Sequence, residues 1–150
     1  MSKLRERAIT SSNNNVGQER HELYKSAFSW ISHSISEGYY LEAVSIIESL
    51  LSDRLESYLS SLLQSNFGFQ NLGPLIRKAK SHATDEILLS ILEEVDLWRK
   101  ARNKAAHEMV KIEAGKFINW EERRKFNQET ADTGLLLVRK VDKRIRQLRS

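Results

Sequence analysis

The feature that most constrains this chain is the helical spacing of its apolar residues. Only one Pro and six Gly interrupt the 150 residues, and apolar side chains recur every three or four positions almost throughout. This pattern predicts four long helices, over about 18–36, over about 40–64, after Thr84 and from Asn119 onward, and one short helix over 74–80. The expected fold is all-α: an antiparallel four-helix bundle with the short extra helix between the second and third long helices.

Local signals sharpen this prediction for three of the long helices. Thr84 is predicted to cap the third, and Asn119 with Glu122 is predicted to form a capping box at the start of the fourth. The second carries so broad an apolar band that we expect it to contact more than one surface. The apolar stripe predicted for the fourth comprises Phe126, Thr130, Thr133, Leu137, Val141, Ile145 and Leu148.

Length and composition favour one domain. Residues 1–17 lack a periodic pattern and are predicted to form a flexible N-terminal arm, with the helical domain over 18–150. The chain has no Cys, its N-terminus shows no apolar leader, and no run approaches the ~18 apolar residues that a membrane span needs. We therefore expect a cytoplasmic protein with no membrane partner.

Several kinds of chemistry have no signature here. Four scattered His residues without any Cys predict no metal site. His107-Glu108 begins like a zinc-protease helix, but Lys111 stands where the second His ligand is required. No Gly-rich nucleotide loop and no nucleophile elbow is present, so no cofactor is expected.

Basic residues concentrate near the C-terminus. The net charge of the chain is only +4, yet the segment from Arg139 to Ser150 holds six cations against the single acid Asp142. The six are Arg139, Lys140, Lys143, Arg144, Arg146 and Arg149. Such a cluster can attract RNA phosphates or an acidic partner, or it can be a solvated helix end whose cations complement the helix dipole.

One cation interrupts an apolar stripe. Leu88, Ile91, Val95 and Trp98 recur at helical spacing, and the next position in the series is Arg102. A buried guanidinium is costly without an anion, so its partner is either an internal carboxylate such as Glu48 or a bound phosphate.

A histidine follows Arg102 after five residues. On an ideal helix Arg102 and His107 are ~7.5 Å apart in rise and about 140° apart in direction. They could flank one phosphate only if the helix bends or if two symmetry-related copies meet. The alternative is an Arg satisfied by an acidic neighbour and a surface His at a fraying helix end.

The motif Arg102-Asn103-x-x-x-His107 near the end of the third long helix resembles the R-x4-H signature of HEPN domains. The segment from Gly38 through Glu48 to Leu51 also resembles the second helix of that family. The resemblance covers about residues 18–149. It implies a four-helix bundle, and many proteins of this fold are metal-independent ribonucleases that act as homodimers, often as toxins or antiviral effectors.

The resemblance also implies roles for the matching residues. His107 would act as general base or acid, Arg102 would stabilise charge on the phosphate, and Asn103 would orient the site, with Glu48 in support. One departure is that Met109 stands where the subgroup paired with a nucleotidyltransferase antitoxin has Tyr, which puts that pairing in doubt.

The partners expected from this interpretation are RNA, held in part by the basic C-terminal cluster, a second copy of the chain, and an antitoxin or defence-system protein. Two other interpretations remain open. One is a non-catalytic module that binds RNA, a nucleotide or a protein. The other is a structural bundle whose basic end docks onto an acidic protein.

Overall fold

The computed structural model describes residues 5–149, and every regular element in that range is a helix. The elements are α1 (Val16–Glu37), α2 (Tyr40–Leu63), α3 (Leu72–His82), α4 (Glu86–His107) and α5 (Trp120–Arg149). The predicted all-α bundle is confirmed, including the short helix between the second and third long ones. No helix among these residues is long and apolar enough to cross a membrane.

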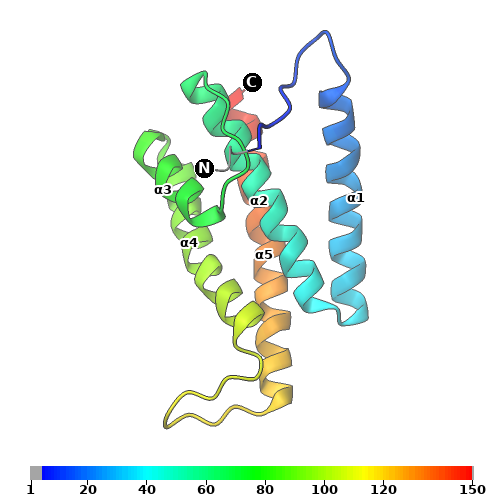
Figure 1. Ribbon diagram of the computed structural model, residues 1–150, viewed down its shortest axis with the longest axis vertical. Coiled ribbons are helices and arrows are strands. Elements are labelled where there is room, and N and C mark those ends of the chain that lie inside the picture. The colour runs from blue at the N-terminus through cyan, green and yellow to red at the C-terminus, as the bar shows by residue number, and fades with distance from the viewer. Residues whose placement is uncertain (1–4, 150) are drawn as a thin grey trace.

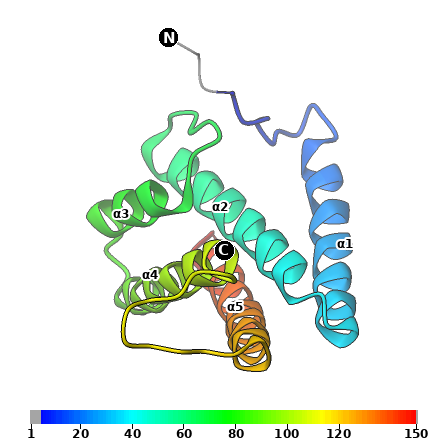
Figure 2. The ribbon, with the colours of Figure 1, turned by 60° about the horizontal axis from the view of Figure 1, so that its bottom comes forward.

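The bundle is built from two antiparallel helix pairs (Figure 1). The chain runs down α1 and back up α2, then down α4 and back up α5, and α2 lies beside α5 in the centre. Helix α3 packs across α2 and α4, while α1 covers the outer side of α2 (Figure 2). The start of α1 and the ends of α2 and α5 therefore meet at one end of the molecule, opposite the α4–α5 connection.

Helix α2 forms the centre of the core, as its broad apolar band predicts. Its buried apolar residues are Ala43, Val44, Ile47, Leu50, Leu51, Leu55 and Leu59. They pack against α1, α3 and α5, so the band is used within one chain. The width of the band is therefore no argument for a second copy.

Side-chain oxygens cap the N-termini of α4 and α5. Asn119 Oδ1 accepts a hydrogen bond from the backbone N–H of Glu122 at 2.8 Å, as its position predicts. The cap of α4 is Asp85 rather than Thr84: its Oδ2 accepts from the N–H of Leu88 at 2.8 Å. Sequence reasoning placed this cap one residue too early because both side chains can cap a helix.

The buried face of α5 is shifted from the predicted stripe. Thr130, Leu137, Val141 and Ile145 are buried, but Thr133 is exposed. Its place is taken by Gly134, where a Cβ would lie only 2.7 Å from Trp98 Nε1. The missing side chain lets the backbone of α5 approach the indole of α4, which fixes the rotation of α5.

The chain before α1 is held against α2 by Arg7. This side chain is only 6% exposed and pairs with Asp53 of α2. Its backbone exchanges two hydrogen bonds with the side chain of Asn66. Of the predicted flexible arm, residues 1–4 lie outside the described range.

Candidate functional site

Arg102 occupies a core-spaced position on α4 and is satisfied by Glu48 of α2. Its neighbours in the stripe, Trp98 and Ala105, are 3% and 2% exposed, whereas its own side chain is 19% exposed. Nη2 donates to Glu48 Oε1 in an ion pair that joins the two helices. Of the two partners expected from the sequence, the structure has the carboxylate. The Nε of Arg102 is buried and makes no hydrogen bond.

Glu48 connects this ion pair to solvent. Its side chain is 24% exposed and lines a groove of about 420 Å³ beside α2. Hydroxyl groups of Ser45, Ser49 and Ser52 share the wall of this groove. Arg102 is thus anchored at a surface groove rather than sealed in the core.

His107 is the last residue of α4 and is exposed, and Asn103 is half-buried one turn earlier. Because α4 stays helical through His107, the directions of Arg102 and His107 remain about 140° apart. No hydrogen bond or ion pair within the described range joins these three residues. One copy of the chain therefore presents the arginine toward α2 and the histidine toward solvent.

Arg123 fixes the connection that follows His107. Its guanidinium donates to three backbone carbonyl groups of the α4–α5 connection, those of Glu108 at 2.6 Å, Lys111 at 2.9 Å and Ile118 at 3.0 Å. No sequence signal points to this role, because Arg123 is one of many charges at the start of α5.

A second contact between the α4–α5 connection and α5 involves Met109, the residue that departs from the family pattern. Its sulfur accepts a hydrogen bond from the amide Nδ2 of the buried Asn127 at 3.0 Å. Sequence reasoning also missed Asn127, which the predicted stripe of α5 left out. Together with Arg123, this contact holds the start of the α4–α5 connection against the first turns of α5.

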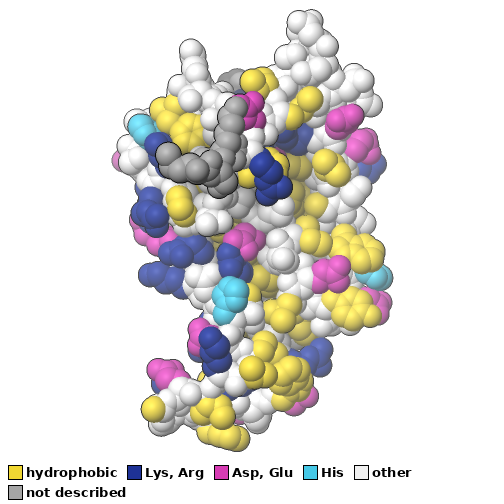
Figure 3. Space-filling model, in the orientation of Figure 1, with side chains coloured by type: hydrophobic (Ala, Val, Ile, Leu, Met, Phe, Trp, Pro, Cys, Tyr) yellow, Lys and Arg dark blue, Asp and Glu magenta, His cyan; other side chains and the backbone are white. Residues whose placement is uncertain are grey.

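Exposed apolar side chains follow His107 in the α4–α5 connection and at the start of α5. In the lower part of Figure 3, hydrophobic side chains cover the α4–α5 connection and the start of α5. Val110 is 83% exposed, Ile112 72%, Phe117 85% and Trp120 56%. A patch of this kind is typical of a surface that meets another protein.

The six cations predicted to bind RNA do not form one patch. Arg139 lies over the ring of Phe28, Lys140 and Arg144 pair with carboxylates on the α4 side, Lys143 is exposed, and Arg146 and Arg149 turn toward α2. The start of α5 lies near His107, and Arg146 follows Arg123 by ~35 Å along the helix. The C-terminal cations and His107 thus occupy opposite ends of the bundle.

The best-defined pair among these cations is that of Arg144 with Asp85. Nε donates to Oδ2 at 2.8 Å and Nη2 to Oδ1 at 2.6 Å, so the guanidinium binds both carboxylate oxygens. These bonds, and then the bond from the N–H of Leu88, lower the pKa of Asp85 to about 2. Arg144 therefore helps to cap α4.

This pair predicts a defined acid dependence of stability. The pKa of Asp85 is about 2 when folded, against ~3.9 for an unperturbed Asp, so its contribution is complete above about pH 4 and lost as pH falls through 2. Asp85→Asn keeps a capping side chain but removes the charge. We expect the variant to have a lower Tm than the original chain at pH 7, and the difference to shrink between pH 4 and 2 in thermal melts. A difference that stays constant down to pH 2 would contradict this role.

Residues 5–149 contain no group of three or more His, Cys, Asp or Glu side chains placed to hold a metal ion. The chain matches no protein-family model, no curated protein and no solved structure. The comparisons thus leave the resemblance to HEPN domains as a prediction.

Proposed function

We propose that this chain is an endoribonuclease of the HEPN type that works without a metal ion. The observation that carries the proposal is the R-N-x3-H motif at the end of α4, in which Arg102 stands at a core position and pairs with Glu48, a residue that lines a surface groove. The guanidinium at that position favours a role for its charge, because a hydrophobic residue would pack better there.

The reaction needs only a base, an acid and a cation. His107 takes the proton from a ribose 2′-OH, and the 2′-oxygen attacks the adjacent phosphorus. The bond from phosphorus to the 5′-oxygen breaks, and a histidine donates the proton that this oxygen requires. Arg102 stabilises the extra negative charge on the phosphate, and Asn103 orients the ribose. The products carry a 2′,3′-cyclic phosphate and a 5′-hydroxyl.

The proposed site requires two copies of the chain, because one copy directs Arg102 and His107 apart. A twofold axis near the end of α4 would bring four of these side chains around one RNA strand. The exposed apolar patch of Val110, Ile112, Phe117 and Trp120 follows His107 in the chain and supports an interface there. Arg123, which fixes this connection, would then act as a positioning residue.

We expect a homodimer in solution. Light scattering at micromolar concentration should give about twice the chain mass of 17.4 kDa. Replacing Ile112 and Phe117 together with Ser should weaken the dimer, because it removes apolar area from the patch. Leu23→Ser alters an equally exposed apolar residue on α1 and should leave the dimer intact. A monomeric mass at every concentration would remove the basis for a shared site.

A specific observation favours a second candidate. Glu48 already neutralises Arg102, which is what a structural ion pair requires, and this is compatible with a non-catalytic module that binds RNA, a nucleotide or a protein. The family resemblance alone supports a role as a cytoplasmic toxin or antiviral effector. The same holds for its inhibition by an antitoxin or a defence-system partner.

The test is direct. Purified protein is incubated with total RNA in the presence and absence of EDTA, and the new ends are analysed. We expect cleavage in both conditions and 2′,3′-cyclic phosphate ends. Cleavage that EDTA abolishes, or products with 3′-hydroxyl ends, would exclude the proposed chemistry.

A further inference from the structure

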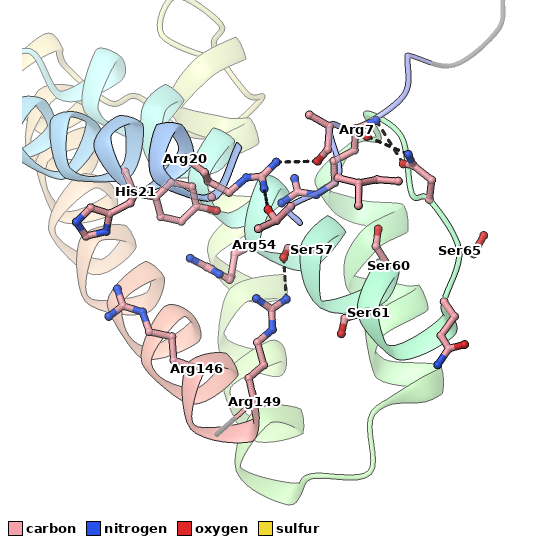
Figure 4. Close-up of a pocket in the computed structure, with 17 residues that line it drawn as sticks. Arg7, Arg20, His21, Arg54, Ser57, Ser60, Ser61, Ser65, Arg146 and Arg149 are labelled. Atoms are coloured by element: carbon pink, nitrogen blue, oxygen red, sulfur yellow. Dashed lines mark hydrogen bonds between the residues drawn. The ribbon is translucent and has the colours of Figure 1, made fainter. Parts of the chain in front are cut away.

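A cavity lies at the end of the bundle opposite His107. It has a volume of about 700 Å³, within the range of small-molecule sites. Its walls come from the segment before α1, the first turns of α1, the C-terminal half of α2 and the end of α5 (Figure 4). Five arginines line it: Arg7, Arg20, Arg54, Arg146 and Arg149.

Three of these arginines, Arg54, Arg146 and Arg149, lie on the side of the cavity that α2 and α5 form. In Figure 4, Arg149 of α5 points toward Ser57 of α2, Arg146 points toward the part of α1 that carries His21, and Arg54 of α2 lies between them. Arg149 Nη2 donates to the hydroxyl of Ser57 at 2.7 Å. Arginine forks of this kind, joined by a hydroxyl, are the donors that bind phosphate oxygens in proteins.

The cavity carries more positive charge than its own carboxylates neutralise. Arg7 and Arg20 share Asp53, and Arg7 also approaches Glu56 at 3.6 Å. Burial raises the pKa of Glu56. On this side of the cavity, two arginines are thus paired with two carboxylates.

The other three arginines have one carboxylate between them. Asp142 pairs with Arg54 at 2.8 Å and with Arg146 at 2.5 Å. Arg149 has no carboxylate partner among the described residues. Partial desolvation of the guanidinium at the cavity wall lowers the pKa of Arg149, and repulsion from Arg54 and Arg7 adds to the effect. The site therefore holds a surplus of about two positive charges.

The partial charges at nearby helix ends change the positive surplus of the cavity only in part. The positive end of α1 faces the cavity at Gly17. The side chain of its N-cap residue Asn15 makes no capping hydrogen bond, but Asn14 Oδ1 accepts one from the N–H of Val16 at 3.1 Å. The ends of α2 and α5, which lie nearby, carry about half a negative charge each. Together these two ends outweigh the favourable end of α1 by about half a charge, which reduces the arginine surplus of about two charges but does not remove it.

We infer that this cavity binds a small anion with two or more linked phosphate groups, such as the polyphosphate of a nucleotide. A longer RNA strand fits the observations less well, because most of the cations from Arg139 to Arg144, which precede Arg146 along the described part of α5, are engaged by other groups, and among them Lys143 alone is exposed without such a contact. Arg144 is bound to Asp85, Lys140 to Glu94, and Arg139 lies over an aromatic ring. The site is separate from Arg102 and His107 and does not rest on the proposed cleavage reaction.

Calorimetric titration with sodium tripolyphosphate at constant ionic strength tests this inference. We expect saturable one-to-one binding that Arg146→Gln with Arg149→Gln weakens about tenfold or more, because two charge-assisted contacts are lost. Both side chains are exposed, so the variant should keep its helicity. The control is Arg139→Gln with Lys143→Gln, which removes the same charge from exposed positions of α5 outside the cavity and should change affinity less than about twofold.

Competition experiments test whether a nucleotide can supply the linked phosphates. ATP should displace tripolyphosphate, adenosine should not, and His107→Ala should bind tripolyphosphate as the original chain does. The inference is overturned if millimolar tripolyphosphate produces no binding heat. It is also overturned if both double variants lose affinity equally, or if a single-stranded RNA binds tightly through Arg146 and Arg149 while tripolyphosphate does not.

Discussion

His107→Ala is expected to lower the rate of RNA cleavage by about 10²–10⁴, the usual contribution of a general acid or base. The helix should survive, because His107 is exposed at the last position of α4. Arg102→Ala should have a comparable effect on cleavage, and the double variant should be scarcely slower than either single one, because groups that act together are non-additive. Rates are measured with a defined RNA oligonucleotide in the presence of EDTA.

The matched control for the histidine is His82→Ala. His82 is likewise exposed in the last turn of a helix, α3, so both substitutions remove the same interaction with a helix end. Its effect on cleavage should be within twofold. Undiminished cleavage by a folded His107→Ala protein would refute the catalytic assignment, even if Arg102 proved necessary for stability.

Substitutions at Glu48 distinguish a catalytic role of Arg102 from a structural one. If Arg102 serves only the bundle, Arg102→Ala destabilises the chain by leaving Glu48 unpaired, and Glu48→Gln in the same chain restores stability. If Arg102 serves catalysis, that double variant regains stability and stays inactive. Glu48→Gln alone leaves the guanidinium in place, so it should retain measurable cleavage.

Much of the fold was predictable because helical periodicity reports the buried face of each helix. The same reasoning placed Arg102 in an apolar stripe and named Glu48 as one possible partner, and the structure confirms that pair. The prediction failed where close backbone contact decided the packing. Trp98 and Gly134 look unrelated in the sequence, yet their contact moves the buried face of α5 away from Thr133.

The arginine-lined cavity and the partners of the C-terminal cations could not be predicted from the sequence, for a different reason. Arg54 and Arg149 are far apart in the sequence, and neither interrupts an apolar stripe. Only the parallel alignment of α2 and α5 brings them to one cavity. The C-terminal cations were visible as a cluster in the sequence, but helical geometry turns them to several faces. Local composition predicted their charge and not their partners.

The contact between α4 and α5 predicts a second large effect. Trp98 is 3% exposed, and its Nε1 donates to the backbone carbonyl of Thr130 at 2.8 Å, so the ring cannot tilt without losing that bond. A Cβ at residue 134 would lie within 2.8 Å of three indole atoms. Gly134→Val should therefore destabilise the chain by about 3 kcal/mol despite its better helix propensity, which lowers Tm by roughly 6–12 °C.

Two further variants separate this steric effect from a general cost of Val in a helix. Thr133→Val places the same side chain at the neighbouring exposed position and should change stability by less than about 0.5 kcal/mol. In a Trp98→Phe background the smaller ring lacks the atoms that the introduced valine side chain would meet, so Gly134→Val should cost less there, with an interaction energy above about 0.5 kcal/mol. Thermal melts of the original chain, the two single variants and the double variant complete the cycle. Equal Tm values for Gly134→Val and Thr133→Val would show that this glycine does not set the approach of α5 to α4.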